Sequence, residues 1–392
     1  MRRGHLLQRI RPAEWVALIF LTWLGAQIAV RGLTVGDGEL RRFDLFAALM
    51  VVVFARQVLR FRALRWPEEA RAFARAHWVL LPIVLVPLAL DVVTVIRLPA
   101  GAFSLDQGGA LAAGLRAIWW LWRRFALAGL PLVLVWLAAG IHVKQHGGLN
   151  ARVFLAESAK GIGRAVRDWA PLLTLLFSYG ILGAVLDRPE SEDKDALLSA
   201  IDRALFFGHD PVLALQAIIN RPLSEWLTFA YTFYGPIFPL CFGLFYFRED
   251  PRAFRELTFA ICFALAVGFF CYTIVPAQGP VFTQHFTVDL GDYYSRWMKE
   301  NLMDRLRVPR DCFPSLHTAT TLIFLLEARR HAKRLFWFLL PIVASIPFAC
   351  VYLRYHYVID VIVGVPLALG AVWLARRLYA VSGAPVRTAW TS

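Results

Sequence analysis

Two short stretches near the C-terminal end combine histidines and an aspartate in a way that could carry out phosphoryl chemistry. His317 lies in RDCFPSLHT, residues 310–318, while His356 and Asp360 lie in YLRYHYVIDVIVG, residues 352–364. A neutral imidazole with a fixed tautomer can attack phosphorus. A carboxylate four residues further along a helix can accept a hydrogen bond from one ring nitrogen and leave the other free for that attack. A second histidine can protonate the leaving oxygen and later act as a base toward the acceptor.

Polar residues beside these motifs could hold the phosphate group. Arg310 and Arg354 stand close to the two histidines, and arginine binds phosphate oxygens through paired hydrogen bonds. Ser315 and the free amides at the start of the next helix would add donors. The competing interpretation is that each histidine caps a helix and that the His–Asp pair is a helix-surface interaction. The predicted site consists of the catalytic residues His317, His356 and Asp360 and the phosphate ligands Arg310, Ser315 and Arg354.

The composition indicates a membrane protein. Of the 392 residues, 58% are hydrophobic, and the mean hydropathy is +0.55, so a soluble domain of this composition could not cover its surface. The net charge of +14 fits basic loops against anionic lipid better than a nucleic-acid-binding surface. We expect membrane lipids as partners and no nucleic acid, and the sequence leaves the oligomeric state open.

Apolar runs long enough to cross a bilayer recur along the chain, and they predict an all-α polytopic protein with about ten transmembrane helices. With the N-terminus in the cytoplasm, more than half of the 42 basic residues fall in cytoplasmic segments. Both termini are then cytoplasmic, and both motifs lie at the non-cytoplasmic face. The excess of arginine over lysine hints at a bacterial gene, and hence at the periplasmic face of an inner membrane. The predicted spans are 13–30, 43–59, 78–97, 125–143, 170–186, 223–247, 256–275, 314–328, 335–353 and 357–375.

Two outer loops are predicted to contain helices that lie in the membrane interface, at residues 194–208 and 291–308. Gly208 is placed to end the first of these helices. The tryptophans and arginines of residues 115–125 are typical of a membrane-interface anchor. The predicted division of the chain is residues 1–169 as N-terminal transmembrane helices of unknown role, 170–380 as the catalytic core and 381–392 as a cytoplasmic tail.

No metal or other cofactor is expected, because a histidine nucleophile needs no metal-bound water. His142 and His146 have the spacing of metal ligands on one helix, but no acidic residue or third histidine follows nearby. The five cysteines form no CxxC pair, which gives no indication of a zinc site. Cys271, Cys312 and Cys350 are predicted to lie near one face as free thiols, with a disulfide between two of them as the open alternative.

The two motifs resemble those of a known family. CFPSLHT, residues 312–318, and LRYHYVIDVIVG, residues 353–364, are similar to the second and third signature motifs of the type 2 phosphatidic acid phosphatase superfamily. The sequence FPSLH, residues 313–317, and the upstream YTIVPAQGPVF, residues 272–282, resemble those of the inositol-phosphorylceramide synthase-like branch. The resemblance covers roughly residues 200–378 and implies a C-terminal catalytic helix bundle of the same kind.

The resemblance also implies a role for each matched residue. His356 would be the nucleophile that forms a phosphohistidine, Asp360 would orient it, and His317 would act as general acid and then as base. Ser315 would help to hold phosphate. The sequence departs from the phosphatases in two ways: the lysine of their first motif is absent, and Cys350 replaces the arginine that normally stands six residues before the third-motif histidine.

These departures favour transfer between lipids over hydrolysis of a soluble ester. The predicted function is an integral-membrane lipid phosphotransferase, with a phospholipid donor and a sphingolipid or glycerolipid acceptor. A lipid phosphate phosphatase that uses the same trio is the alternative. A proton-coupled transporter is a further alternative from another class, and it would require broken helices and internal repeats in both halves of the sequence, which we do not find.

Overall fold

The structure is a computed structural model that describes five main stretches of the chain, together with Val308 and scattered residues between 164 and 187. The chain forms two compact units, one of residues 1–33 and 171–390 and the other of residues 34–170 and 391–392. The five main stretches all belong to the first unit. They are residues 10–31, 193–247, 251–291, 293–299 and 310–381.

Several sequence predictions fall outside the described residues. These are the spans 43–59, 78–97 and 125–143, the interface segment 115–125 and the histidine pair His142 and His146. The division of the chain at residues 169 and 380 also stays a prediction.

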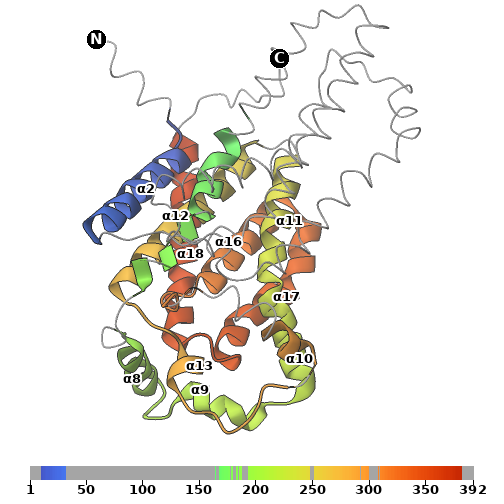
Figure 1. Cartoon of the computed structure of the whole chain (residues 1–392). Helices are drawn as coiled ribbons and strands as arrows, with labels where there is room; N and C mark the ends of the chain where they lie inside the picture. The colour runs from blue at the N-terminus through green and yellow to red at the C-terminus, as the bar shows by residue number, and fades with distance from the viewer. Residues whose placement is uncertain are drawn as a thin grey trace, which may run out of the picture. The chain divides into compact units, whose positions relative to one another are not determined.

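The described residues form helices and connecting loops and contain no β-strand, as the all-α prediction requires (Figure 1). Short helices lie at the end of the bundle that also carries the start of α10. The long helices are α2 (Pro12–Arg31), α10 (Arg221–Thr232), α11 (Tyr234–Phe247), α12 (Pro251–Ile274), α16 (Leu316–His331), α17 (Lys333–Tyr352) and α18 (Val358–Val381). The short ones are α8 (Asp195–Leu205), α9 (Pro211–Ala214), the 3-10 helix η3 (Leu215–Ile218), α13 (Pro280–Thr283) and α14 (Tyr294–Met298).

Helix α16 is the centre of the bundle, where it packs against α11, α12, α17 and α18 (Figure 1). Its side chains Ala319, Ile323 and Phe324 are fully buried. Polar residues are tolerated at this depth because Thr320 and Thr321 donate their hydroxyl protons to carbonyls one turn earlier, at 2.7 and 2.6 Å. The central helix can therefore carry polar groups without leaving their hydrogen bonds unmade.

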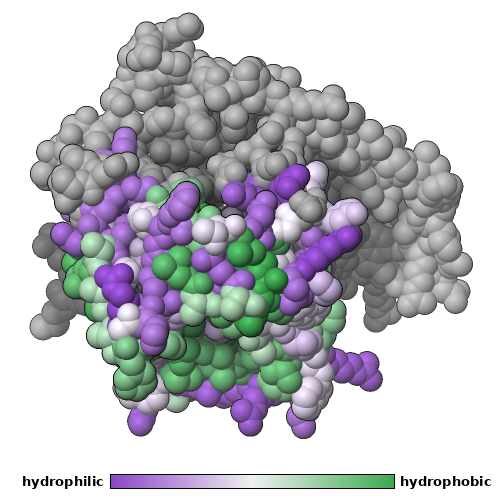
Figure 2. Space-filling view, turned by 90° about the horizontal axis from the view of Figure 1, so that it is seen from below, coloured by the Kyte–Doolittle hydropathy of each residue, from purple (hydrophilic) through white to green (hydrophobic). Residues whose placement is uncertain are grey.

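Three helices of the described part, α12, α17 and α18, are long and apolar enough to cross a membrane, and the pair α10–α11 would be a fourth if it forms one span. Large apolar side chains such as Trp337 and Trp373 project from α17 and α18 with 68% and 59% of their surface exposed. In a bilayer such exposed apolar surface would face lipid. The view from the end that carries α8 and α9 shows hydrophobic and hydrophilic residues mixed on the described surface (Figure 2). These findings indicate a membrane protein, but they do not confirm a count of ten spans.

The predicted span 223–247 is not one straight helix. It is divided into α10 and α11, whose axes differ by 43°. Pro236, in the first turn of α11, has no N–H to donate to the carbonyl of Thr232, and its ring would clash with that carbonyl. The helix therefore ends at Thr232 and restarts at Tyr234 in a new direction.

The predicted helix in residues 194–208 is confirmed as α8. The helix ends at Leu205, before the predicted glycine: Phe207 already has a positive φ of +54°, and the N–H of Gly208 then donates to the carbonyl of Arg203 at 2.7 Å. In the other predicted loop helix, residues 291–308, the described residues form the short helix α14, and residues 300–307 are not among those that the structure describes.

Helix α8 is tied to the start of α18 by one carboxylate. Asp202, which is 1% exposed, accepts hydrogen bonds from the backbone N–H groups of Val358 and Ile359 at 2.7 and 2.9 Å. These two N–H groups have no partner within α18, so Asp202 acts as an N-cap supplied by a distant part of the chain. Burial raises the pKa of Asp202, and the two N–H bonds oppose that shift by favouring the carboxylate.

We expect Asp202→Ala to lower the free energy of unfolding by about 1–3 kcal/mol, because it removes a cap and leaves two buried N–H groups without an acceptor. Denaturant unfolding of the purified protein in detergent measures this change. Asp289→Ala is the matched control, since the Asp289 side chain is 82% exposed. Equal stability of the two variants would contradict the capping role.

Candidate active site

The three predicted catalytic side chains come together at one end of the bundle. His317 lies in the first turn of α16, His356 in the loop between α17 and α18, and Asp360 in the first turn of α18. The ring centroids of the two histidines are 5.8 Å apart, and Nδ1 of His356 lies 3.4 Å from Oδ2 of Asp360. The two imidazoles are thus close enough to contact one small group, and the carboxylate contacts the ring of His356.

A tight turn after α17 delivers His356 to this position. The N–H groups of Tyr355 and His356 both donate to the carbonyl of Cys350, at 3.1 and 3.0 Å, and the N–H of Arg354 donates to that of Val351. The turn requires a positive φ of +70° at Arg354, a conformation that non-glycine residues adopt at an energetic cost. The chain therefore reverses within a few residues, and α18 begins directly after the histidine.

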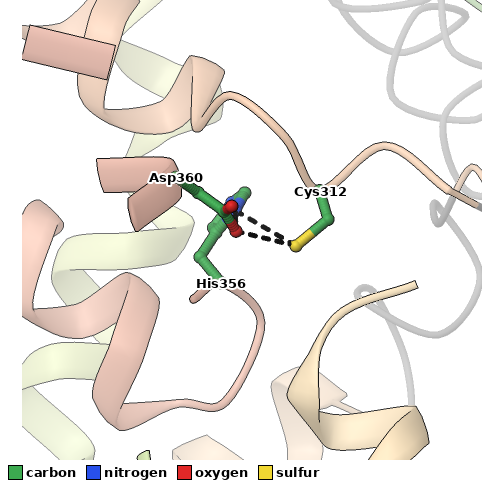
Figure 3. Close-up of side chains that lie close together, drawn as sticks. All are labelled: Cys312, His356 and Asp360. Atoms are coloured by element: carbon green, nitrogen blue, oxygen red, sulfur yellow. Dashed lines mark hydrogen bonds and ion pairs between the residues drawn. The ribbon is translucent and has the colours of Figure 1, made fainter. Parts of the chain in front are cut away.

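The carboxylate of Asp360 is fully buried and organises the centre of the site (Figure 3). Its Oδ2 accepts from the N–H of Tyr357 at 2.8 Å and from the thiol of Cys312 at 2.9 Å, in addition to its contact with His356. Burial, followed by the negative charge of Asp360, raises the pKa of the Cys312 thiol. Cys312 is therefore a neutral thiol that donates its proton to the carboxylate.

Sequence reasoning missed this role of Cys312. Its Sγ also lies 3.7 Å from Nδ1 of His356, although it comes from the segment before α16, far from α18 in sequence. Only its position, three residues before Ser315 in the motif, could have suggested proximity to the site.

The second histidine is held between aromatic rings. The ring of His317 stacks on Tyr231 with a centroid distance of 4.3 Å, and the ring of Tyr234 lies 4.1 Å away on a tilted plane. Tyr231 in turn stacks on Tyr355, at 5.2 Å. The two tyrosines stand on either side of the break between α10 and α11. They fix the orientation of the imidazole and cover much of its surface, a role that no sequence signal indicated.

Ser315 connects the starts of α16 and α18. Its Oγ caps α16 by accepting from the N–H of Thr318 at 3.3 Å, and its own N–H donates to the carbonyl of Asp360 at 3.1 Å. The two helices approach closely because Gly364 has no side chain: a Cβ there would lie 2.8 Å from the carbonyl oxygen of Ser315. The glycine thus sets the spacing between the two helices that carry His317 and Asp360.

The two predicted phosphate-binding arginines are engaged with other partners. Arg310 is buried and forms an ion pair with Asp193. Arg354 donates to the carbonyl of Val288, and its guanidinium lies 4.0 Å from the centre of the Phe286 ring. The described contacts of both guanidinium groups therefore go to residues outside the catalytic trio.

A second buried aspartate supports the turn that carries His356. Asp195 accepts from the N–H groups of Gln278 and Gly279 at 2.9 and 2.8 Å and from the hydroxyl of Tyr357 at 3.1 Å. Gly279 has a φ of +97°, and a Cβ there would lie 2.5 Å from the carbonyl oxygen of Tyr355. The segment 272–282 thereby packs directly against the histidine loop.

All five cysteines are free thiols, so the prediction of free thiols over a disulfide is confirmed. Cys350, which stands where the phosphatases carry an arginine, lies 3.6 Å from the hydroxyl of Ser315. The position of the missing arginine is thus occupied by a small, neutral and fully buried side chain.

Residues 196–374 match a family model described as the PAP2 superfamily. The match includes both motifs and supports the resemblance to the type 2 phosphatidic acid phosphatase superfamily, whose members are phosphatases or phosphotransferases. It does not support the inositol-phosphorylceramide synthase-like branch in particular. No curated protein and no solved structure matches the chain.

We expect Gly364→Ala to lower the free energy of unfolding by about 1–3 kcal/mol, because the added methyl group meets the backbone of Ser315 and forces α16 and α18 apart. Thermal or denaturant unfolding in detergent measures the change. Gly370→Ala on the same helix is the control, since a Cβ there meets no atom within 4 Å. Its effect should be neutral or stabilising by up to about 1 kcal/mol. The same loss in both variants would contradict the role of the close approach, because Gly370→Ala meets no neighbouring atom and gains helix propensity.

Proposed function

We propose that the chain is an integral-membrane lipid phosphotransferase that moves a phospho-head-group from a phospholipid donor to a sphingolipid or glycerolipid acceptor through a phosphohistidine. The observation that carries the proposal is the meeting at 5.8 Å of two histidines, one from the start of α16 and one from the loop between α17 and α18, the second in contact with a fully buried carboxylate. This arrangement provides a nucleophile, its orienting group and a separate acid–base group. The superfamily match is consistent with such chemistry.

In the first half of the proposed reaction, Asp360 accepts the Nδ1–H of His356 and leaves Nε2 with its lone pair. Nε2 attacks phosphorus, so that an N–P bond forms while the bond from phosphorus to the lipid oxygen breaks. His317 donates its proton to that oxygen, and the donor lipid leaves as an alcohol. The carboxylate stabilises the positive charge that develops on the His356 ring.

In the second half, an acceptor hydroxyl occupies the place of the departed alcohol. His317, now neutral, removes the hydroxyl proton as the acceptor oxygen attacks phosphorus. The new O–P bond forms, the N–P bond breaks, and both histidines return to their starting protonation states. The reaction needs no external oxidant, reductant or metal.

Phosphate binding is proposed to begin at the N-terminus of α16. The unpaired N–H groups of its first turn and the positive end of the helix dipole favour an anion beside His317. Ser315 fixes this end of the helix by capping it. Arg310 and Arg354 would have to exchange Asp193 and Val288 for phosphate oxygens in order to join the site, and both lie in the loops that adjoin the two histidines.

Transfer is favoured over hydrolysis by what surrounds His317. Tyr231 and Tyr234 cover its ring at 4.3 and 4.1 Å, which limits the access of water to the group that would activate it. Phosphatases of the superfamily carry an arginine at the position of Cys350 and a lysine in their first motif, and this chain lacks both cations. Hydrolysis by the same trio, as in a lipid phosphate phosphatase, is the alternative, since only the acceptor differs.

The lipidic nature of both substrates explains a catalytic site at the end of apolar helices. We infer that this end faces the periplasm of a bacterial inner membrane, with both chain termini in the cytoplasm. The inference rests on the distribution of basic residues in the sequence. Residues 1–169 would then supply additional spans beside the catalytic core.

We expect His356→Ala, His317→Ala and Asp360→Asn each to reduce turnover by about 100-fold or more. The first removes the nucleophile, the second the acid–base group and the third the orienting charge. Phosphotransfer by purified, detergent-solubilised protein measures the effect. His285→Ala is the control, because His285 is an exposed histidine of the same end of the bundle. Turnover equal to that of the unmodified protein in any of the three variants would remove that residue from the mechanism.

Incubation with phospholipid labelled in its head group, with and without ceramide or diacylglycerol, separates the two candidate reactions. Transfer predicts a new labelled phospholipid only when the acceptor is present. Release of the labelled phosphate or head group at the same rate without acceptor would identify a phosphatase and overturn the transferase assignment.

We expect EDTA to leave activity unchanged, because the nucleophile is an imidazole and not a metal-bound water. The measurement is the phosphotransfer rate before and after dialysis against EDTA. A clear loss that one divalent cation restores would contradict the phosphohistidine mechanism.

A further inference from the structure

The side chains of Cys312, His356 and Asp360 place three metal-ligating atoms in a small triangle (Figure 3). Sγ of Cys312 lies 2.9 Å from Oδ2 of Asp360 and 3.7 Å from Nδ1 of His356, and the third side, Nδ1 to Oδ2, is 3.4 Å. We propose that this triangle is an inhibitory site for a thiophilic divalent cation of the zinc type. The inhibitory part of this inference rests on the proposed function, whereas the binding part does not.

The dimensions of the triangle suit zinc. Bond lengths of about 2.0–2.3 Å in tetrahedral geometry place two ligands of one ion about 3.3–3.8 Å apart. Two sides of the triangle already lie in this range, and the 2.9 Å contact between Cys312 and Asp360 must open by about 0.6–0.8 Å to reach the separation of a sulfur and an oxygen ligand on one ion. The three protein ligands occupy one face of a tetrahedron and leave the fourth position open.

The hydrogen bonding of the three groups leaves room for an ion. The separation of 3.4 Å between Nδ1 of His356 and Oδ2 of Asp360 exceeds the usual length of a strong N–H···O bond. Oδ1 of Asp360 is buried and accepts no hydrogen bond from the described residues. An ion between the three side chains would therefore replace the long contact between His356 and Asp360 and the hydrogen bond from the Cys312 thiol. It would also give the carboxylate a positively charged partner.

The charges around the triangle also favour a cation. Asp360 is fully buried, and two further buried carboxylates, those of Asp195 and Asp202, bind the backbone or hydroxyl of residues 357–359 between the ligands. The nearby arginines, Arg310 and Arg354, direct their guanidinium groups to Asp193 and to the carbonyl of Val288. A dication bound by one thiolate and one carboxylate would be neutralised at the site itself.

A second group of potential ligands, Glu256, Glu327 and His331, differs from the triangle because its carboxylates are already paired with arginines. Arg330 and Arg252 bind the carboxylate of Glu256 at 2.6 and 2.7 Å. Arg376 binds that of Glu327 at 3.0 Å. Guanidinium groups already supply the positive charge there, so this group is a network of ion pairs and we propose no metal for it.

Binding at the triangle would stop the proposed reaction. The Cys312 thiol gives up its proton to solvent as the metal–sulfur bond forms, and Nδ1 of His356 binds the metal as a neutral imidazole whose proton moves to Nε2. Nε2 then has no lone pair with which to attack phosphorus. Asp360 becomes a metal ligand and no longer supports the charge that develops on the ring.

Binding is tested with Co²⁺ as a spectroscopic probe on the full-length protein in detergent. A thiolate ligand gives a sulfur-to-cobalt charge-transfer band, and tetrahedral coordination gives intense visible d–d bands. We expect both bands to saturate at one Co²⁺ per chain and to disappear on addition of excess Zn²⁺. We expect Cys312→Ser to weaken binding by about 100-fold, because the only soft ligand is lost.

Cys271→Ser is the matched control, since Cys271 is the most accessible of the five thiols and lies outside the triangle. This variant should keep both bands. If Cys312→Ser does not fold, Asp360→Asn provides the second test, with weaker Co²⁺ binding expected. Absence of the charge-transfer band in the unmodified protein, or its loss in Cys271→Ser with retention in Cys312→Ser, would overturn the site.

Activity provides the second measurement. Zn²⁺ should inhibit phosphotransfer by the unmodified protein by about tenfold or more at saturation, and EDTA should restore the rate. Each variant is compared with its own metal-free rate. Co²⁺ binding without inhibition by Zn²⁺ would overturn the inhibitory role. Co²⁺ binding that requires Cys312, in a protein that transfers no phosphate, would instead support the metal site and refute the proposed function.

Discussion

The charge of a fully buried carboxylate must be satisfied by the protein alone, and Asp360 imposes this constraint on the whole catalytic end of the bundle. Three groups converge on its Oδ2: the ring of His356 and the N–H of Tyr357 from the histidine loop, and the thiol of Cys312 from the segment before α16. Removing any of them leaves a charge in surroundings of low dielectric, which is costly. The positions of α16, α18 and the connecting loop are therefore coupled to one side chain.

Small residues and strained turns make this convergence sterically feasible. Gly364 lets α18 approach the carbonyl of Ser315, and Gly279 lets the segment 272–282 approach the carbonyl of Tyr355. Arg354 adopts a left-handed conformation so that the chain can reverse between α17 and α18. Asp195 and Asp202 then bind the backbone that these contacts bring within reach. Each contact restrains the same loop from a different direction, so His356 is held by packing and hydrogen bonds together.

Local patterns in the sequence predicted much of this architecture. Apolar runs located α12, α17 and α18, because long apolar helices are the strongest pattern that a sequence contains, and they also located the shorter α16. The spacing of four between His356 and Asp360 is also local, and the structure brings the pair into contact. Contacts between distant segments were not predictable. The stacking of Tyr231 on His317, the thiol of Cys312 on Asp360 and the cap that Asp202 provides all depend on how helices pack, and no spacing along the chain encodes them.

The bend at Phe233 has a mechanical consequence for the site. Tyr231 lies in the last turn of α10 and Tyr234 is the first residue of α11, and both rings contact the imidazole of His317. The imidazole is therefore held by both halves of the broken helix, and its two aromatic contacts depend on the angle between α10 and α11.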